Sequence, residues 1–417
     1  MCMPIYSVVV DEGHGSKSLS YASNVEVPVG YAVEVPYGAT TKRGVVVGPG
    51  EVVPGLKSIT RVYGARTDAG VIAAAEAARS FYATSSLWAV YQHLAPAHYK
   101  GNPATKRTTL PRKEGHGGDR FYFLGPAATI LYGVKHAIGQ QQHRGQVLVL
   151  CADRYTAEQI ADHVPGAAFL DPAPGKGQPS AWRGFTEGLI QVGVATKAGA
   201  LWGTSKVQTI IVCDDLHPGY TEQKAPYWNA ADAALLRARV TGAAYVTVSH
   251  RASRTSTQLP VEYVPGPDGK LFVIDRSDAG GGQRDVPTAL YVKVKSLQKQ
   301  GPCVFLVNPT ATWWCSSCKA VGTGLTHCEH CGSGRRTELS WSAKKVKTVF
   351  GANCKTLTLS TLLRDASRVH AEAAVIIPDV DGFLLSPSYT AGALYFSAMA
   401  AARQYAGSQP VLLCTNM

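Results

Sequence analysis

Short apolar runs separated by glycine and proline turns dominate the first 64 residues of the chain. Residues 6–10, 31–35 and 45–47 are rich in β-branched side chains, and Gly48-Pro49-Gly50 is the clearest turn between such runs. β-branched and aromatic residues fit the pleated surface of a strand, whereas Gly and Pro end strands. The pattern therefore predicts a small, barrel-like β-domain.

The pattern becomes helical after this β-rich part. Residues 71–82 have the composition and spacing of a helix, and residues 85–93 are expected to form a second one. We assign residues 1–99 to an N-terminal domain on this basis. Residues 100–120 follow with six basic side chains among glycine, proline and threonine and with no apolar periodicity, so they are predicted to be a basic linker.

Short apolar strands alternate with helical stretches from residue 121 onward. This alternation predicts a parallel sheet covered by helices on both faces. We assign residues 121–264 to a first α/β lobe and the Gly- and Pro-rich residues 265–287 to a second linker. The expected strands are 121–124, 147–151, 191–196, 209–213 and 245–249, and the expected helices are 127–140, 157–163 and 229–241.

The last part of the chain repeats this pattern and is predicted to be a second α/β lobe at residues 288–417. A cysteine-bearing module at residues 313–336 interrupts it. The fold class is therefore α/β, with a small N-terminal β-barrel-like domain followed by two parallel α/β lobes. The expected strands are 303–307, 348–350, 375–378 and 411–413, and the expected helices are 288–300 and 391–405.

Four of the ten cysteines are concentrated in one short segment. Cys315 and Cys318 form one C-x2-C pair, and Cys328 and Cys331 form a second one nine residues later. Two residues between cysteines let both thiolates of a tight turn face one ion, and two such turns make the tetrahedral sulfur site that zinc prefers. We predict one structural Zn²⁺ without an open coordination position; redox cysteines and an iron–sulfur cluster are the alternatives.

The charge of the chain indicates a polyanionic partner. Its 417 residues allow two or three domains, and Lys and Arg outnumber Asp and Glu by 41 to 29, which gives a net charge of +12. The alternative is a basic, solvated surface. No apolar run reaches the ~18 residues of a membrane helix, and the start of the chain lacks the order of a signal peptide. We therefore expect a cytoplasmic protein that does not contact membranes.

Two carboxylates and a histidine follow the apolar run that ends at residue 213. Asp214, Asp215 and His217 stand where helicase-type ATPases place their magnesium-coordinating acids. Such ATPases also need a loop G-x-x-x-x-G-K-[ST], whose amides and lysine hold the phosphates. Counted from Gly125, this chain lacks the second glycine and the lysine, and Pro126 removes an amide donor. We expect neither ATP nor Mg²⁺ to bind this degenerate site, and no residue is assigned a catalytic role.

These segments resemble, in order, the primosomal replication-restart helicase family (PriA type). The resemblance rests on residues 19–21 and 35–38, on the segment from Asp214 to residue 220, and on residues 328–333. It implies an N-terminal domain that binds the 3′ end of a nascent strand, followed by two helicase-like lobes. The residues expected to contact DNA are Tyr21, Lys42, Arg43 and Lys57.

Several departures separate the chain from that family. Ser20 replaces the acid of the 3′-hydroxyl pocket, the G-T-R and S-A-T segments appear as residues 195–197 and 249–251, and four cysteines remain of eight. We therefore predict a shortened, monomeric, non-hydrolysing scaffold that binds forked or single-stranded DNA and recruits replication or primosome proteins. The alternatives are an active helicase with an unusual nucleotide site and a protein-interaction module that has lost DNA binding.

Overall fold

A computed structural model shows two compact units within the chain. The first comprises residues 1–124 and 130–263, and the second comprises residues 125–129 and 264–417. Among the helices described here, none is long and apolar enough to cross a membrane. The residues that the structure describes are 3–12, 17–84, 86–95, 120–124, 130–141, 145–171, 181–222, 227–249, 261–263, 270–275, 286–307, 312–323, 327–338, 341–359, 361–362, 373–384 and 391–415.

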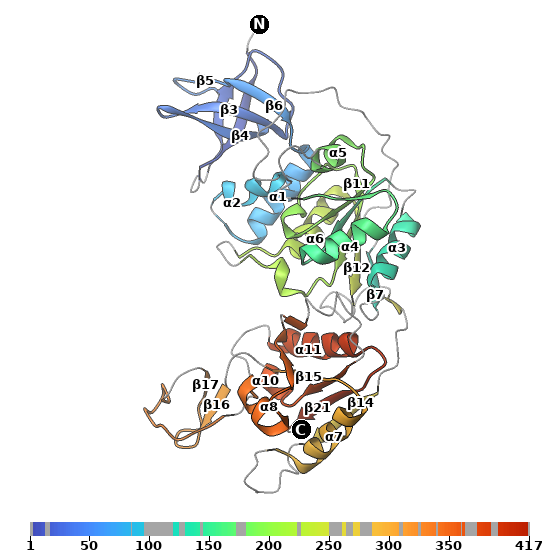
Figure 1. The fold of residues 1–417 in the computed structure, drawn as a ribbon. Helices are drawn as coiled ribbons and strands as arrows, with labels where there is room; N and C mark the ends of the chain where they lie inside the picture. The colour runs from blue at the N-terminus through green and yellow to red at the C-terminus, as the bar shows by residue number, and fades with distance from the viewer. Residues whose placement is uncertain are drawn as a thin grey trace. The chain divides into compact units, whose positions relative to one another are not determined.

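A curled, mixed half-barrel sheet opens the first unit, as the β-rich pattern predicted (Figure 1). Its strand order is β5-β2-β1-β4-β3-β6, and all neighbours are antiparallel except β2 and β5. Val8, Val33 and Val46 fill the inside of the curl, whereas Val9 and Val45 on the other face join the core of the adjoining α/β lobe. The strands are β1 (Ile5–Val10), β2 (Leu19–Ala22), β3 (Tyr31–Tyr37), β4 (Thr40–Pro49), β5 (Lys57–Ser58) and β6 (Arg61–Ala65).

Helix α1 (Ala69–Phe81) connects this sheet to the first α/β lobe. Asp68 caps it by accepting a hydrogen bond from the Val71 N–H at 3.3 Å, and it also accepts from the N–H and Oγ of Ser205 at 2.9 and 2.8 Å. The Asp68 carboxylate therefore caps the amino end of α1 and also binds the loop of the lobe that contains Ser205. The predicted second helix is shorter than expected, with α2 (Trp88–Tyr91) followed by a 3₁₀ turn, η1 (Gln92–Leu94).

The first α/β lobe is a parallel sheet with the order β13-β7-β12-β11-β8-β10-β9. Strands β8, β11 and β12 are buried along their whole length, because helices cover both faces of the sheet. All five predicted strands are confirmed. The strands are β7 (Arg120–Leu124), β8 (Gln146–Leu150), β9 (Ala167–Phe169), β10 (Val192–Ala195), β11 (Val207–Cys213), β12 (Ala244–Ser249) and β13 (Val261–Tyr263).

Two groups of helices cover the two faces of this sheet (Figure 1). Apolar side chains of α3 and α4 share one core with the sheet, whereas those of α1, α5 and α6 belong to the other core. The helices that follow β7 and β8 in the chain, α3 and α4, therefore cover one face, and the later helices α5 and α6 cover the other. The elements are α3 (Ile130–Gln141), α4 (Arg154–His163), α5 (Ala181–Glu187), η4 (Lys197–Gly199), η5 (Pro218–Tyr220) and α6 (Ala230–Thr241).

The second unit contains a five-stranded parallel sheet with the order β14-β21-β20-β15-β19. Helices α7 and α8 pack on one face of it, and α10 and α11 pack on the other. Its elements are β14 (Leu271–Asp275), α7 (Thr288–Gln300), β15 (Cys303–Leu306), α8 (Ala343–Phe350), β19 (Lys355–Leu357), β20 (Ala374–Ile377), α10 (Asp381–Leu384), α11 (Ala391–Ala406) and β21 (Val411–Thr415).

Two elements of this unit differ from the prediction. The strand predicted at residues 348–350 is wrong, because this β-branched run is the last turn of α8, which Ser342 caps and whose Val346 and Phe350 point into the core. β14 lies inside the predicted second linker, where its alternating side chains make an edge strand beside β21.

A small antiparallel sheet lies between β15 and α8 in the chain. Its order is β17-β16-β18, and it carries the four clustered cysteines on and between its strands. A separate small core of Trp313, Cys315 and Cys328 holds it together. The strands are β16 (Thr312–Cys315), β17 (Val321–Thr323) and β18 (Arg336–Glu338).

Candidate functional site

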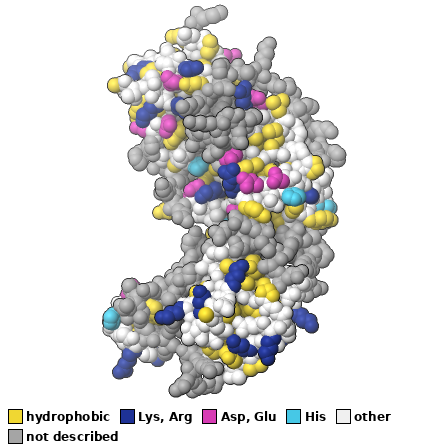
Figure 2. Space-filling model, viewed as in Figure 1, with side chains coloured by type: hydrophobic (Ala, Val, Ile, Leu, Met, Phe, Trp, Pro, Cys, Tyr) yellow, Lys and Arg dark blue, Asp and Glu magenta, His cyan; other side chains and the backbone are white. Residues whose placement is uncertain are grey.

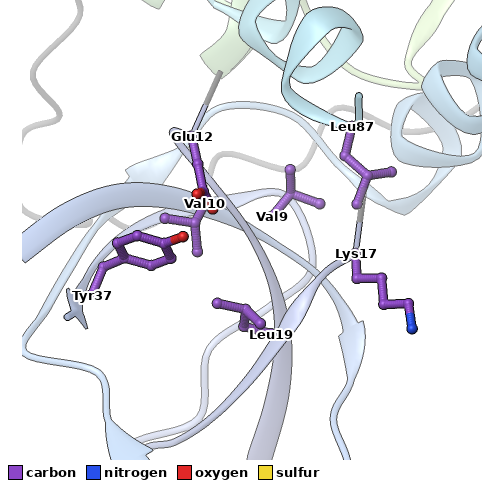
Figure 3. A pocket seen from close by; sticks show the side chains of 7 residues that line it. All are labelled: Val9, Val10, Glu12, Lys17, Leu19, Tyr37 and Leu87. Carbon is purple, nitrogen blue, oxygen red and sulfur yellow. The ribbon is translucent and has the colours of Figure 1, made fainter. Parts of the chain in front are cut away.

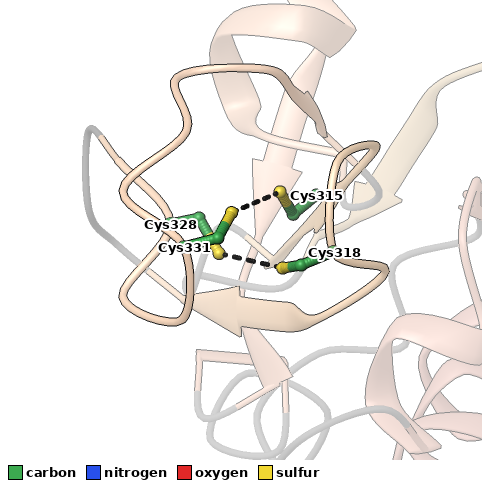
Figure 4. Close-up of side chains that lie close together, drawn as sticks. All are labelled: Cys315, Cys318, Cys328 and Cys331. Carbon is green, nitrogen blue, oxygen red and sulfur yellow. Dashed lines mark hydrogen bonds between the residues drawn. The ribbon is translucent and has the colours of Figure 1, made fainter.

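The four cysteines of the small sheet meet at one point (Figure 4). Their sulfur atoms all lie within 4.8 Å of one another. The Sγ atoms of Cys315 and Cys331 are 3.6 Å apart, and those of Cys318 and Cys328 are 3.5 Å apart. These distances are those between the corners of a sulfur tetrahedron with Zn–S bonds of about 2.3 Å. The cluster is consistent with a structural zinc site.

Both cysteine pairs sit on turns of the same geometry. In the first turn, the Lys319 N–H donates to the Cys315 carbonyl at 2.8 Å, and in the second the Gly332 N–H donates to the Cys328 carbonyl at 2.8 Å. Lys319 and Gly332 have φ values of 66° and 68°, the left-handed region in which glycine is favoured. The repeated backbone geometry explains why two C-x2-C pairs aim four sulfurs at one point.

The four clustered thiols differ in acidity, because the pKa of Cys315 is lowered whereas those of Cys318 and Cys331 are raised. Hydrogen bonds from the backbone of Cys318, and also of Ser317, lower the pKa of Cys315 to about 6. A thiol with such a pKa is largely thiolate at neutral pH, the form that coordinates metals. His327 and His330 are exposed and do not belong to the cluster of four.

A pocket of about 420 Å³ opens on the N-terminal sheet and contains two of the four predicted DNA-binding residues. Tyr21 and Lys57 line it; the Tyr21 hydroxyl donates to the Pro36 carbonyl at 3.1 Å, and the Lys57 Nζ lies 3.5 Å from the Gly38 carbonyl. The complete lining is Ser18, Leu19, Ser20, Tyr21, Pro36, Tyr37, Gly38, Glu51, Val53, Gly55, Leu56 and Lys57.

A second hollow of about 200 Å³ shares Leu19 and Tyr37 with this pocket (Figure 3). Glu12 lies beside the Tyr37 hydroxyl, and the hydrogen bond to its carboxylate raises the pKa of Tyr37. Lys17, at the rim of the hollow, points away from Tyr37 in Figure 3. The two hollows therefore flank one tyrosine ring, which is held in place by an acid.

The other two predicted DNA-binding residues lie on opposite faces of β4. Lys42 stands over the Tyr37 ring, with its Nζ 4.7 Å from the ring centroid, and so belongs beside the pocket. Arg43 is the next residue along the strand and is paired with Glu34 of β3. Successive side chains of a strand point to opposite faces, so Arg43 does not join Tyr21, Lys42 and Lys57.

No role for Tyr37 or Glu51 was predicted from the sequence, although both line the pocket. Tyr37 was visible within the segment that carries the family resemblance. Glu51 gave no signal because it follows a turn, and only the fold brings it to Ser20, whose Oγ accepts a hydrogen bond from the Glu51 N–H at 3.0 Å. It adds a carboxylate to the pocket in which Ser20 stands.

The two carboxylates of the first α/β lobe follow β11, at the carboxyl end of the sheet. Asp214 is 5% exposed, has a φ of 53°, and accepts a hydrogen bond from the Ser249 Oγ at 3.3 Å. That bond links the end of β11 to the end of β12. The carboxyl ends of the strands are where open α/β sheets bind ligands. Asp215 follows directly, while Gly125 lies outside the described residues.

Tyr220 anchors the segment that follows these acids. It is fully buried, and its hydroxyl lies 2.8 Å from the Leu150 carbonyl and 2.7 Å from the Cys213 carbonyl. His217 accepts a hydrogen bond at Nδ1 from the Gly219 N–H at 2.9 Å. A Cβ atom on Gly219 would lie 2.8 Å from the Ala152 carbonyl oxygen, so only glycine fits. Packing and hydrogen bonding within the lobe therefore account for much of the sequence of this segment.

Comparisons with known proteins give a distant structural similarity to helicases. No protein-family model matches the chain, and no curated protein matches it significantly. Three similar solved structures are the DUF1998 helicase MrfA (12% identity, 72% of this chain, 47% of that chain, TM-score 0.35), the DExH-box NTPase HrpB of E. coli (13%, 72%, 39%, 0.37), and RecG bound to a three-way DNA junction (12%, 72%, 40%, 0.36).

The chain spans less than half the length of each of these three proteins. The similarity is too distant to assign a family or an activity. It does not single out the primosomal replication-restart family, so that resemblance stays a prediction from the sequence.

Proposed function

We propose that this protein is a non-hydrolysing scaffold that binds forked or single-stranded DNA and recruits replication proteins. The observation that carries this proposal is the pocket on the N-terminal sheet, where the partly exposed Tyr37 lies near Lys57 and Lys42 stands over its ring. Tyr21, which was expected to contact DNA, is only 4% exposed and packs into the core of the sheet, so it supports the pocket and does not stack on a base. Aromatic rings stack on bases and lysines bind phosphates, and the two together are typical of single-strand recognition. The net charge of +12 favours the same partner.

The pocket also offers groups suited to the end of a strand. Ser20 and Glu51 place a hydroxyl and a carboxylate near Lys57. A carboxylate accepts a hydrogen bond from a sugar hydroxyl, which an internal nucleotide of DNA lacks. In this proposal the pocket therefore prefers a free 3′-hydroxyl, as the resemblance implies.

Lys57 and Lys42 give the test of this proposal. Lys42→Gln/Lys57→Gln should weaken binding of forked DNA roughly tenfold, because two phosphate contacts are lost. Arg61→Gln, an exposed change on the same sheet, should have less than a twofold effect. Wild-type affinity in the double variant would contradict the proposal. A wild-type protein that captures replication proteins and shows no DNA affinity would identify a protein-interaction module instead.

A second candidate function is ATP hydrolysis, which the position of Asp214 favours. Its carboxylate lies at the carboxyl edge of the sheet and is hydrogen-bonded to Ser249 of the neighbouring strand. Hydrolysis stimulated by forked DNA and abolished by Asp214→Ala would establish an active motor. No turnover above the rate without protein is the result expected for the scaffold.

A further inference from the structure

A lysine-rich surface covers one face of the second sheet. Helices α7 and α8 contain three lysines each and no acidic residue. Their apolar sides, which include Leu290, Val294, Val346 and Phe350, pack into one core on the sheet. The lysines are therefore confined to the outer sides of two helices that lie on the same face.

These lysines fall into two groups with different surroundings. Lys293, Lys295 and Lys345 lie against aromatic rings, at 3.9 Å from Phe272, 5.6 Å from Tyr291 and 5.1 Å from Trp341, measured from Nζ to the ring centroid. The side chains in the second group, Lys299, Lys344 and Lys347, are exposed. Their charges are available to a partner.

Two of the lysines stand where folding disfavours them. Lys344 and Lys345 are in the first turn of α8, directly after its cap Ser342, and that turn contains no acid. The amino end of a helix carries partial positive charge, so a cation there destabilises the helix. The helix dipole favours Lys299 and Lys347, which are in last turns, but it cannot explain Lys344 and Lys345. A local preference that a sequence violates points to function.

The charged side chains of α7 and α8 have one sign, unlike the described charges of the first unit. In Figure 2, Lys and Arg side chains are spaced over the second unit, while basic and acidic side chains intermingle on the first. Among the described large apolar side chains that are exposed, none lies on α8 and a single one, Val292, lies on α7. A protein partner needs a buried apolar or aromatic anchor, whereas a phosphate backbone needs only spaced cations.

We propose that α7 and α8 form a second nucleic-acid surface, which binds the phosphate backbone of DNA without reading its bases. This inference shares its partner class with the proposed function, but it rests on different residues in a different unit. It predicts phosphate contacts that remain when the pocket of the N-terminal sheet is altered.

The test compares two double variants of the full chain that remove the same charge. Lys344→Gln/Lys347→Gln changes α8, and Lys135→Gln/Arg239→Gln changes exposed positions on α3 and α6. For forked DNA, the α8 variant should lower the magnitude of the slope of log Kd against log salt by roughly 1.5, because each lost phosphate contact removes about 0.7–0.9. The control variant should keep the wild-type slope.

Three further results distinguish a phosphate-binding surface on α7 and α8 from a loss of structure, from DNA binding through the N-terminal pocket alone, and from a surface for acidic proteins. The α8 variant should keep a melting temperature close to that of the wild type, because the helix dipole disfavours Lys344 and favours Lys347 and the two effects offset each other. A large drop would mean that lost structure causes the effect. A slope change in Lys42→Gln/Lys57→Gln alone would overturn this inference and leave the proposed function intact. Equal slopes in the α8 variant and its control, with lost binding of polyglutamate in the α8 variant only, would instead identify a surface for acidic proteins.

Discussion

Arg237 is a fully buried cation whose hydrogen bonds hold a turn of the first lobe in place. Its guanidinium donates to the carbonyls of Ala200, Trp202 and Thr204 at 3.1, 2.7 and 3.0 Å. Burial lowers its pKa to about 10, which still leaves it charged at neutral pH. Only arginine presents enough donors in a fixed plane to serve three carbonyls at once.

Removing this side chain should be costly. Arg237→Ala leaves three buried carbonyls without their donor and opens a cavity, so we expect the free energy of unfolding to fall by about 3 kcal/mol or more. The neighbouring exposed Arg239 supplies the control, and Arg239→Ala should change stability by less than about 0.5 kcal/mol. Urea unfolding followed by circular dichroism measures both. Similar midpoints for the two variants would show that the three hydrogen bonds contribute little.

His93 should make the stability of the first unit depend on pH. Its ring stacks on Trp228 with centroids 4.3 Å apart, and burial lowers its pKa to about 4. The unfolded chain, with a histidine pKa of about 6.5, then binds the proton more readily than the folded chain does. Stability is complete above pH 6.5 and is lost as the pH falls toward 4.

The expected loss is about 2 kcal/mol, less than the full shift implies because the ring keeps some contact with solvent. His93→Phe retains the stacking and removes the proton-binding group. Its free energy of unfolding should therefore fall less than that of the wild type between pH 6.5 and 4.5. Identical pH profiles for the two proteins would mean that other groups cause the acid sensitivity.

Structural elements with a clear local sequence pattern could be predicted from the sequence, whereas the edge strand β14 could not. The C-x2-C spacing predicted the cysteine cluster because each turn is formed within a few residues. Residues 348–350 were read as a strand from their β-branched side chains, but burial of Val346 and Phe350 one turn apart made them helical. β14 was missed because it is short, exposed on alternate residues and set among glycines.

The pocket of the N-terminal sheet could be predicted only in part. Its lining comes from three separate stretches, residues 18–21, 36–38 and 51–57, which meet because the sheet curls. Tyr21 and Lys57 were identified from sequence, whereas Glu51 was not, since nothing local links it to Ser20. Arg43 was grouped with Lys42 by adjacency, although neighbours in a strand face opposite ways.

Metal removal should unfold the cysteine module and leave the sheet of the second unit folded. The module has a small core of its own, formed by Trp313, Cys315 and Cys328, while α7 and α8 belong to a different core. Structural zinc can contribute on the order of 10 kcal/mol to the folding of such a module. Chelation, or Cys328→Ser, should shift tryptophan fluorescence and speed proteolysis near residue 325 with little loss of helical signal.

This result of metal removal is expected only if the cysteine module folds independently of the sheet of the second unit. Cooperative loss of the whole far-ultraviolet signal on chelation would contradict that independence. Cys354→Ser serves as the control, because Cys354 lies in the core beneath α7 and α8 and not in the cluster of four. It should leave zinc content unchanged.

At the scale of the whole molecule, two features support a DNA-binding scaffold. The chain carries a net charge of +12; Lys57 lines the pocket in the first unit with Lys42 beside it, and α7 and α8 of the second unit carry three lysines each. Two such surfaces on one chain would let it hold a branched substrate at more than one place. Electrostatic binding of this kind weakens as salt displaces the protein from phosphate.

The salt dependence of forked-DNA binding is the sharpest test of whether the basic groups of this protein contact phosphates. With about five phosphate contacts, a plot of the logarithm of the association constant against the logarithm of salt concentration should have a slope of roughly −4 to −5. Fluorescence anisotropy of the zinc-loaded protein between about 50 and 200 mM salt gives this slope. A slope near zero, or no binding at the lowest salt concentration, would contradict the central claim that the protein binds DNA.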